Sequence, residues 1–291
     1  MVNMMNKLKN QYYKIIRIKH RYFNPFNIMT SIETLDKIMK TKCSMCRYGD
    51  GELLMLTEDY SITFQKYDPQ LAERLRGILK SDDDKIIVCL PYMLKSLNNL
   101  HHKDYWYWED RLFENRRKIY KLTQKGKLYG DTQCTRPYII KIDKSDTEEI
   151  FYRVKQLCDN QDLLIVEGEH TCLGVGNDLL SKSKSIERIL APAANAFDYY
   201  DRILEETSKR AENKLVLIAL GPTATVLAYD LAKLGFWALD VGHIDIEYEW
   251  FLCGTDKKIP IKAKHVNEVL EGRNPEENTN EKYLSEIVFR I

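Results

Sequence analysis

The 291-residue sequence contains no apolar run close to the roughly 20 residues that a membrane-spanning helix requires. Its first residues also lack the apolar core and small-residue cleavage site of a signal peptide. The seven cysteines are an odd number and are irregularly spaced, which in a chain without an export signal indicates reduced thiols. We therefore expect a cytoplasmic protein without a transmembrane helix.

Familiar nucleotide and metal signatures are missing as well. Neither the Gly-x-Gly-x-x-Gly fingerprint nor the Walker A lysine motif is present, which counts against a dinucleotide dehydrogenase and a P-loop enzyme. Cys43 and Cys46 have the spacing of half a zinc site or of a redox pair, but no second Cys/His pair matches it. We interpret both cysteines as small buried side chains.

Acidic residues are absent before Glu33, although the net charge of the whole chain is only +1. The basic residues of this N-terminal arm (residues 1–30) alternate with aromatic and branched ones; they are Lys7, Lys9, Lys14, Arg17, Lys19 and Arg21. Two hypotheses stay open: weak contact with the inner face of an anionic membrane, or a helix packed on the domain or frayed. No linker-like tract divides residues 31–291, so we predict one domain there.

Short apolar runs alternate with helix-like segments along the rest of the chain. Strands are predicted at 42–48, 85–90, 128–131, 162–166, 189–192, 215–220 and 236–241, and helices at about 31–40, 103–124, 145–159 and 197–211. Further helices are expected after Gly51, from Asp68-Pro69, after Thr223 and after Asp178. This alternation predicts an α/β fold with a mainly parallel sheet flanked by helices.

Two acids follow the last predicted strand. If the chain stays extended there, Asp245 and Glu247 point to the same side and suit Mn²⁺ or Mg²⁺, which would bridge a diphosphate. His243 would lie on the same face. Alternatively, Ile246 belongs to the core and the acids are solvated or cap a helix.

The turn Gly221-Pro222-Thr223 joins a predicted strand to a helix. Backbone N–H groups at such a helix start can bind a phosphate, and proline at the first helical position leaves the others free. Simple capping by Thr223 is the alternative role.

A second turn, Gly49-Asp50-Gly51-Glu52, also follows a predicted strand. Its two glycines allow close backbone approach to a ligand, and Asp50 or Glu52 could bind ligand hydroxyls or act as general base. The alternative is a turn with acids at a helix start, where the helix dipole favours them. Arg47 and Arg136 could neutralise diphosphate oxygens, or form structural ion pairs.

Two further sets are weaker candidates. Glu167, Glu169 and His170 follow a buried strand and could contact a second ligand, although each alone is more often structural. The aromatic run at residues 105–108 could stack on a ring of such a ligand, but packing in a core or an oligomer explains it more simply. Asn177 and Asp178 are expected to cap a helix.

Several motifs, in order, resemble the GT-D glycosyltransferases, a bacterial family first described as a domain of unknown function. The matching stretches are Arg47-Tyr48-Gly49-Asp50-Gly51-Glu52, Gly130-Asp131-Thr132 with Thr135-Arg136-Pro137-Tyr138, Glu167-Gly168 with Gly174-Val175-Gly176-Asn177-Asp178, and Gly221-Pro222-Thr223-Ala224 through Gly242-His243-Ile244-Asp245-Ile246-Glu247-Tyr248. The resemblance implies a Rossmann-like fold, a UDP-sugar donor (UDP-glucose in the type case) and a divalent metal. The Asp-x-Glu metal motif of the family falls on Asp245 and Glu247.

The predicted function is therefore a metal-dependent transfer of a hexose from a UDP-sugar to a hydroxyl of a glycan or glycoprotein. A metal-dependent phosphohydrolase and a non-catalytic nucleotide-sugar-binding module are the alternatives. A homo-oligomer is compatible with the sequence, and we expect no nucleic-acid partner.

Overall fold

The computed structural model describes residues 25–291, so the predictions for the basic arm concern residues that lie almost entirely outside the described part. Its centre is one continuous sheet of nine strands in the order β1-β4-β3-β2-β8-β7-β5-β6-β9, with every described pairing parallel. The predicted α/β fold with a parallel sheet is confirmed. Within residues 25–291 no helix is both long and apolar enough to cross a membrane.

The strands follow the apolar runs of the sequence closely. They are β1 (Asn27–Ile28), β2 (Ser44–Arg47), β3 (Ile86–Leu90), β4 (Leu128–Asp131), β5 (Asp162–Gly168), β6 (Ser185–Ala191), β7 (Leu215–Ala219), β8 (Trp237–Asp240) and β9 (Ile287–Arg290). The central strands are buried almost throughout, as expected where helices cover both faces of a parallel sheet. β6 begins at Ser185 rather than Ile189, and β9 was not predicted.

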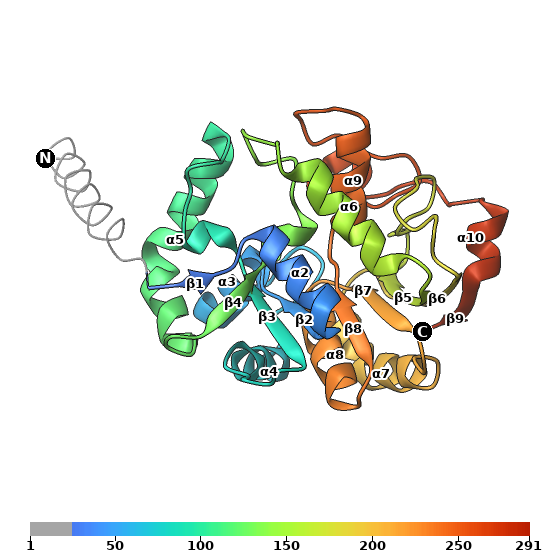
Figure 1. Ribbon diagram of the computed structural model, residues 1–291, viewed down its shortest axis with the longest axis horizontal. Helices are drawn as coiled ribbons and strands as arrows, with labels where there is room; N and C mark the ends of the chain where they lie inside the picture. Colours follow the sequence, from blue (N-terminus) through green and yellow to red (C-terminus); the bar gives the residue numbers. More distant parts are fainter. Residues whose placement is uncertain (1–24) are drawn as a thin grey trace, which may run out of the picture.

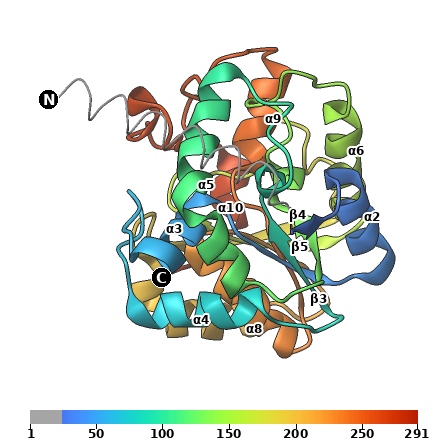
Figure 2. The ribbon, with the colours of Figure 1, turned by 90° about the vertical axis from the view of Figure 1, so that its left-hand side faces the viewer.

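Helices cover both faces of the sheet. They are α2 (Ser31–Thr41), α3 (Asp50–Glu58), α4 (Pro69–Leu79), α5 (His102–Leu122), α6 (Thr147–Cys158), α7 (Tyr200–Ser208), α8 (Pro222–Lys233), α9 (Ile244–Leu252) and α10 (Glu281–Glu286). Helices α4, α8 and α7 lie together on one face and α2 and α6 on the other (Figure 1). Figure 2 shows α5 facing the viewer beside α3, which it contacts.

Helix starts agree with local capping rules. The Asp68 carboxylate accepts hydrogen bonds from the amides of Gln70 and Leu71, and Pro69 occupies the first turn of α4, as predicted. At α2, Thr30 and Glu33 form a complete capping box, so Thr30 is the N-cap.

Two segments differ from the predictions in ways that matter for the site. The chain after Asp178 forms turns instead of a helix, and just before it the backbone bends at Gly174 and Gly176, which have positive φ values of 73° and 82°. Residues 244–252, where an extended continuation was expected, form helix α9. The polar stretch 272–282 is mostly irregular and leads into α10.

Candidate functional site

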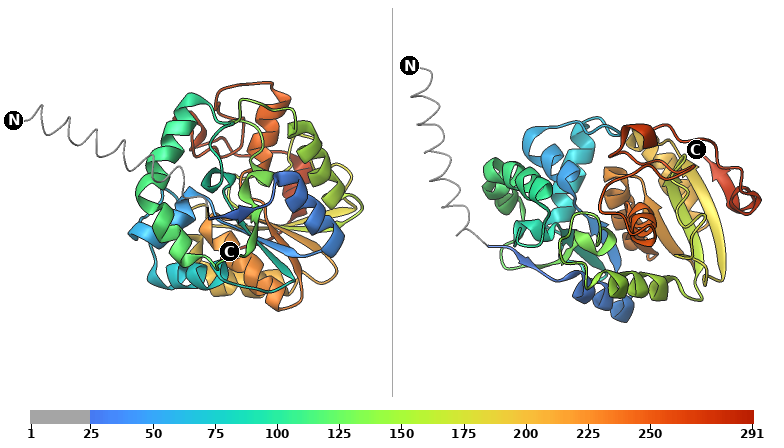
Figure 3. Two further views of the ribbon diagram at one scale, coloured as in Figure 1. Left: turned by 60° about the vertical axis from the view of Figure 1, so that its left-hand side comes forward. Right: turned by 90° about the horizontal axis from the view of Figure 1, so that it is seen from above.

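A cavity of about 600 Å³ lies at the carboxyl ends of the strands, which is where open parallel α/β sheets bind ligands. Five strands contribute lining residues at or just after their ends: Arg47 from β2, Thr132 from β4, Gly168 from β5, Ala219 from β7 and Asp240 from β8. Helices α5 and α9 add further lining residues, and Figure 3 shows them well separated across the molecule. The volume is that of a typical small-molecule site.

Arg47 and Asp240 form an ion pair at the base of this cavity. Arg47 Nη1 lies 3.2 Å from Asp240 Oδ1, and the hydroxyl of Thr225 donates to the other carboxylate oxygen at 3.2 Å. Burial raises the pKa of Asp240 above its ordinary value, and the guanidinium of Arg47 opposes that rise. Arg47 therefore occupies the predicted place but is already paired, and its Nε is buried without a partner among the described residues.

The paired acids Asp50 and Glu52 line the cavity at the start of α3. Glu52 Oε2 accepts a hydrogen bond from the Gly49 amide at 2.7 Å, and Asp50 accepts one from the Tyr107 hydroxyl. Burial raises the pKa of Glu52 to about 7, with the nearby charges of Asp240 and Asp50 adding to the effect. The structure thus places both acids on the predicted rim, and their chemical roles stay predictions.

Asp245 and Glu247 do not face the same ligand. Both lie in the first turn of α9, where residues two apart point in nearly opposite directions, so the prediction of a shared side was wrong. Asp245 Oδ1 accepts from the Gly174 amide at 2.9 Å and from Asn177 Nδ2 at 2.8 Å. Asp245 Oδ2 lies 2.7 Å from Lys264 Nζ, so the charge of Asp245 is already balanced by a buried lysine.

The carboxylate of Glu247 is fully buried, and each of its oxygens accepts at least one hydrogen bond. Its Oε2 accepts from the amides of Tyr138 and Ile139, both at 3.0 Å, and its Oε1 lies 3.2 Å from Arg136 Nε. Asp245 Oδ1 and Glu247 Oε2 each accept two hydrogen bonds, whereas Asp245 Oδ2 and Glu247 Oε1 each have one described partner, a cation. A metal ion bound at either residue would have to share the carboxylate with that cation. Among residues 25–291 no cluster of three or more His, Cys, Asp or Glu side chains could hold one. The metal itself stays a prediction.

Arg136 connects Glu247 to the cavity. Its Nη2 lies 2.7 Å from Glu268 Oε1, and Glu268 Oε2 lies 3.8 Å from Nδ1 of His243. Burial opposes ionisation of Glu268, but nearby His243 and Arg136 hold its pKa well below the usual range. Burial lowers the pKa of His243. Glu268 lies in an irregular segment without a motif, so no sequence pattern indicated it.

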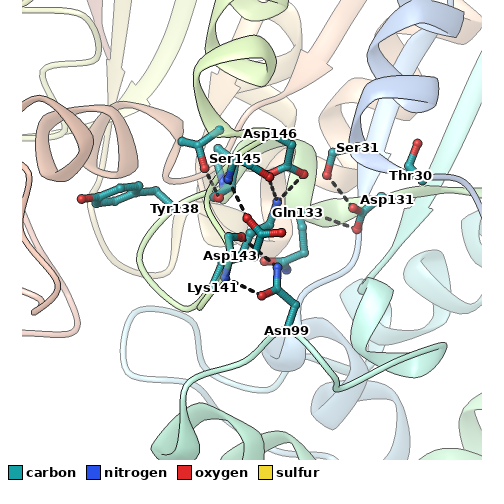
Figure 4. Close-up of polar contacts among 12 residues, drawn as sticks. Thr30, Ser31, Asn99, Asp131, Gln133, Tyr138, Lys141, Asp143, Ser145 and Asp146 are labelled. Atoms are coloured by element: carbon teal, nitrogen blue, oxygen red, sulfur yellow. Dashed lines mark hydrogen bonds and ion pairs between the residues drawn. The ribbon is translucent and has the colours of Figure 1, made fainter.

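The segment that carries Arg136 is anchored at both ends (Figure 4). At its start, the hydroxyl of Ser31 donates to Asp131 at 2.6 Å, and burial raises the pKa of Asp131 to about 6. At its end, Lys141 Nζ bonds to both oxygens of Asp146 at 2.8 Å. These contacts fix the backbone that presents the guanidinium of Arg136 and the two amides to Glu247.

The predicted phosphate turn is covered by an aromatic ring. Gly221 lines the cavity with a φ of +54°, and a Cβ there would lie 2.4 Å from Cε2 of Phe64. Pro222 and Thr223 are buried behind it, and the Thr223 hydroxyl lies 3.5 Å from Gln65 Oε1. Gly221 therefore reaches the cavity, whereas Pro222 and Thr223 do not line it.

The remaining candidates divide into structural and cavity residues. Glu167 is fully buried and pairs with Arg188 at 2.7 Å, so its place is in the core, whereas Glu169 lines the cavity. Cys43 and Cys46 are buried free thiols, as predicted. The other cavity residues anticipated from the sequence are Gly49, Gly51, Arg136, His243, Asp245, Tyr107 and Trp108.

Fold and site together define a Rossmann-like α/β protein with a ligand cavity at the carboxyl edge of its parallel sheet. The chain belongs to the GT-D glycosyltransferase family, whose model, "Glycosyltransferase GT-D fold", matches residues 45–269. The resemblance seen in the sequence is thereby confirmed.

Two curated relatives are similar over most of this chain. "Glycosyltransferase GlyD" of Streptococcus pneumoniae serotype 4 is 38% identical over 260 residues, covering 89% of this chain and 32% of the relative. "Probable glycosyl transferase Gly" of Streptococcus gordonii is 36% identical over 266 residues, covering 91% and 39%. The chain thus spans only about a third of the length of these relatives.

Two solved structures have the same fold. One, described as "The highly conserved domain of unknown function 1792 has a distinct glycosyltransferase fold", superposes with a TM-score of 0.89 at 37% identity, covering 96% of this chain and 99% of the other. The other, "A New Glycosyltransferase (DUF1792) from Streptococcus sanguinis", gives a TM-score of 0.87 at 36% identity, covering 91% and 99%.

Proposed function

We propose that this protein transfers a hexose, with glucose as the first candidate, from a UDP-sugar to a hydroxyl of a glycan or glycoprotein. The family and the names of its relatives support transfer of a sugar. The observation that carries the proposal is one cavity in which a cation, Arg136, and two acids, Asp50 and Glu52, line the carboxyl edge of the sheet. Such a cavity offers separate groups to the donor diphosphate and to an attacking hydroxyl.

The donor diphosphate binds, in this proposal, beside Arg136. Its guanidinium lines the cavity while two acids hold it in place, Glu247 at 3.2 Å and Glu268 at 2.7 Å. A guanidinium held in this way is oriented before the ligand arrives, which reduces the entropy lost on binding. Arg47 and the backbone of Gly49, Gly51 and Gly221 line the remainder of this part of the cavity.

Glu52 is the better placed of the two acids to act as general base. Its pKa of about 7 lies near the range in which a side chain can both exist as a base and accept a proton efficiently. Asp50, in contrast, accepts the hydroxyl hydrogen of Tyr107 and would orient groups around the reacting hydroxyl. A base is required if the reaction inverts the anomeric centre.

A divalent cation, Mn²⁺ or Mg²⁺, stays part of the proposal on the strength of the family resemblance alone. When bound, such an ion neutralises the charge of the leaving diphosphate. Because Asp245 and Glu247 are engaged by Lys264, Arg136 and backbone amides, we assign the ion no step through them.

The test is a panel of UDP-sugars with Mn²⁺ in which UDP release is measured with and without glycan acceptors. A transferase releases UDP faster when a suitable acceptor is present. A phosphohydrolase would release phosphate without any acceptor, and a non-catalytic module would bind UDP tightly without turnover. Either of those outcomes contradicts the proposal.

The proposed setting is the cytoplasm, with contact at the inner face of the membrane and a homo-oligomer as further hypotheses. The free cysteines support a cytoplasmic setting, and the basic N-terminal arm suggests contact with the membrane.

A further inference from the structure

One side of the cavity carries exposed aromatic rings. Tyr107 on α5 and Tyr60, just after α3, both line the cavity, yet they remain 41% and 44% exposed. Rings that belong to a core would be covered, so these two have faces available to a ligand. Together with Arg111 of α5, which also lines the cavity, we call them the α5 wall.

Arg111 holds the two rings of the α5 wall together. Its guanidinium carbon lies 5.1 Å from the ring centroid of Tyr107 and 5.9 Å from that of Tyr60, both within cation–π range. A cation shared between two rings restricts their motion. The wall is therefore a preformed aromatic surface instead of two independent side chains.

The α5 wall is tied directly to the acids of the cavity. The Tyr107 hydroxyl donates a hydrogen bond to Asp50, two residues from Glu52. Burial, followed by the charge of Asp50, raises the pKa of the Tyr107 hydroxyl, which keeps it protonated as the donor. With its hydroxyl occupied, Tyr107 can offer a ligand chiefly its ring, and a ring stacked on it would place its hydroxyls beside the two acids.

The groups that suit a diphosphate come from other elements. Arg136 follows β4 and His243 precedes α9, while Glu268, an acid in the irregular segment after α9, only holds Arg136 in place. A charged diphosphate is attracted to Arg136, whereas the flat and less polar faces of a sugar ring suit aromatic side chains. The cavity thus has one part for each of two substrates.

We propose that the α5 wall is the acceptor subsite: it stacks on a neutral pyranose ring of the acceptor and presents one hydroxyl of that ring to Glu52. This inference rests on the proposed function, because it assigns the second substrate of that reaction. The uracil ring of the donor is the competing occupant. The hydrogen bond from Tyr107 to Asp50 places the α5 wall beside Glu52, the proposed base, and this favours the acceptor.

The test uses p-nitrophenyl β-glycosides of glucose, galactose and N-acetylglucosamine as acceptors, with the UDP-sugar that the wild-type protein turns over. Tyr107→Ala should raise the acceptor KM about tenfold, as expected for loss of one stacking contact. The UDP Kd measured by calorimetry should stay within about twofold of the wild-type value.

Two further variants separate the ring from other effects. Tyr107→Phe keeps the ring and removes only the bond to Asp50, so its acceptor KM should stay within about twofold of wild type. Trp106→Ala is the matched control, because Trp106 is similarly exposed at 40% but does not line the cavity. It should leave both the acceptor KM and the UDP Kd unchanged.

Saturation-transfer NMR of the same glycosides gives a readout that needs no turnover. The pyranose ring protons of the glycoside should receive saturation transfer from the wild-type protein and from Tyr107→Phe. They should lose this transfer in Tyr107→Ala. The inference is overturned if Tyr107→Ala leaves the acceptor KM unchanged, or if it weakens UDP binding tenfold instead. Glycoside binding at Tyr107 without any transfer by the wild-type protein would leave the subsite standing and contradict the proposed transferase activity.

Discussion

Arg47 at the end of β2 and Asp240 at the end of β8 are joined by a 3.2 Å ion pair that spans the middle of the sheet. β2 and β8 are neighbours: β3, β4 and β1 extend from β2 on one side, and β7, β5, β6 and β9 extend from β8 on the other. The strand that follows β2 in the chain lies on one side of this pair, and the strand that follows β8 lies on the other, so the pair is a topological switch point. Open α/β sheets bind ligands in the crevice at such points. The ion pair therefore joins the two halves of the sheet at the floor of the cavity.

Gly242 makes room for this ion pair, which leads to the first prediction. Its φ is +48°, and a Cβ at this position would lie 2.1 Å from Arg47 Nη1. Gly242→Ala should therefore displace the guanidinium, lower the free energy of unfolding by about 2–3 kcal/mol and weaken UDP binding. Urea unfolding and UDP calorimetry measure the two effects.

Gly235→Ala is the matched control for Gly242→Ala. Gly235 also has a positive φ, of 93°, but nothing lies within 4 Å of a Cβ built there. This control carries the backbone strain without the clash, so it should cost only about 1 kcal/mol and leave UDP binding unchanged. Equal effects on UDP binding in both variants would show that Arg47 does not depend on Gly242.

The second prediction concerns the pH dependence of Glu52. Because its pKa is raised from 4.5 to about 7 in the folded protein, folding favours the protonated form, and that stability is lost as pH rises from about 4.5 through 7. Glu52→Gln removes this loss, so the variant should gain up to about 2 kcal/mol over wild type at pH 8 and little at pH 4. The rate of sugar transfer by Glu52→Gln should fall sharply at every pH if Glu52 is the base.

Glu33→Gln provides a control of opposite sign. The pKa of Glu33 is lowered by its hydrogen bonds to Thr30 in the capping box of α2, so its contribution to stability is present above pH 4.5 and lost at lower pH. This variant should therefore be less stable than wild type at pH 7 and similar to it at pH 3. A Glu52→Gln difference that did not grow between pH 4.5 and 7 would contradict the raised pKa.

Much of the fold could be predicted because its signals are local. The seven apolar runs predicted as strands correspond to β2 to β8, and the helices between them favour parallel pairing. The positions of Arg47, Asp50 and Glu52 at the cavity followed from the same logic, since the ends of parallel strands meet at one edge. Motif order then identified the family.

The rest of the site depends on contacts between distant segments. Whether Asp245 and Glu247 share a side depends on the backbone conformation, and the helix at 244–252 turned them apart. Asp240 was overlooked because an acid that ends a strand has no signature of its own. Glu268 lines the cavity from the irregular segment after α9, which Lys264 anchors through its ion pair with Asp245. No periodic pattern in the sequence indicates such a contact.

The third prediction concerns this anchor. Lys264 is buried and lies 2.7 Å from Asp245 and 2.6 Å from Glu249. Lys264→Met would leave both carboxylates without their cation, so the free energy of unfolding should fall by about 3 kcal/mol. The exposed Lys262 offers a control, because Lys262→Met should change stability by less than about 0.5 kcal/mol. Comparable losses in the two variants would contradict the anchoring role.

The fourth prediction decides between two roles for Glu247. Its carboxylate accepts hydrogen bonds from Arg136 and from the amides of Tyr138 and Ile139, which makes it a clamp for the segment carrying Arg136. Glu247→Gln keeps the size of the side chain but sets an amide against Arg136. The variant should therefore lose about 2 kcal/mol of stability and bind UDP more weakly.

A metal ligand at this position would behave differently, and Mn²⁺ binding separates the two roles. Titration followed by electron paramagnetic resonance in the presence of saturating UDP should give the same Mn²⁺ affinity for Glu247→Gln and wild type if Glu247 acts as a clamp. If Mn²⁺ affinity is lost while the urea midpoint is unchanged, Glu247 is a ligand and must exchange its amide partners for the ion. Because both oxygens of this fully buried side chain already accept hydrogen bonds, we expect the first outcome.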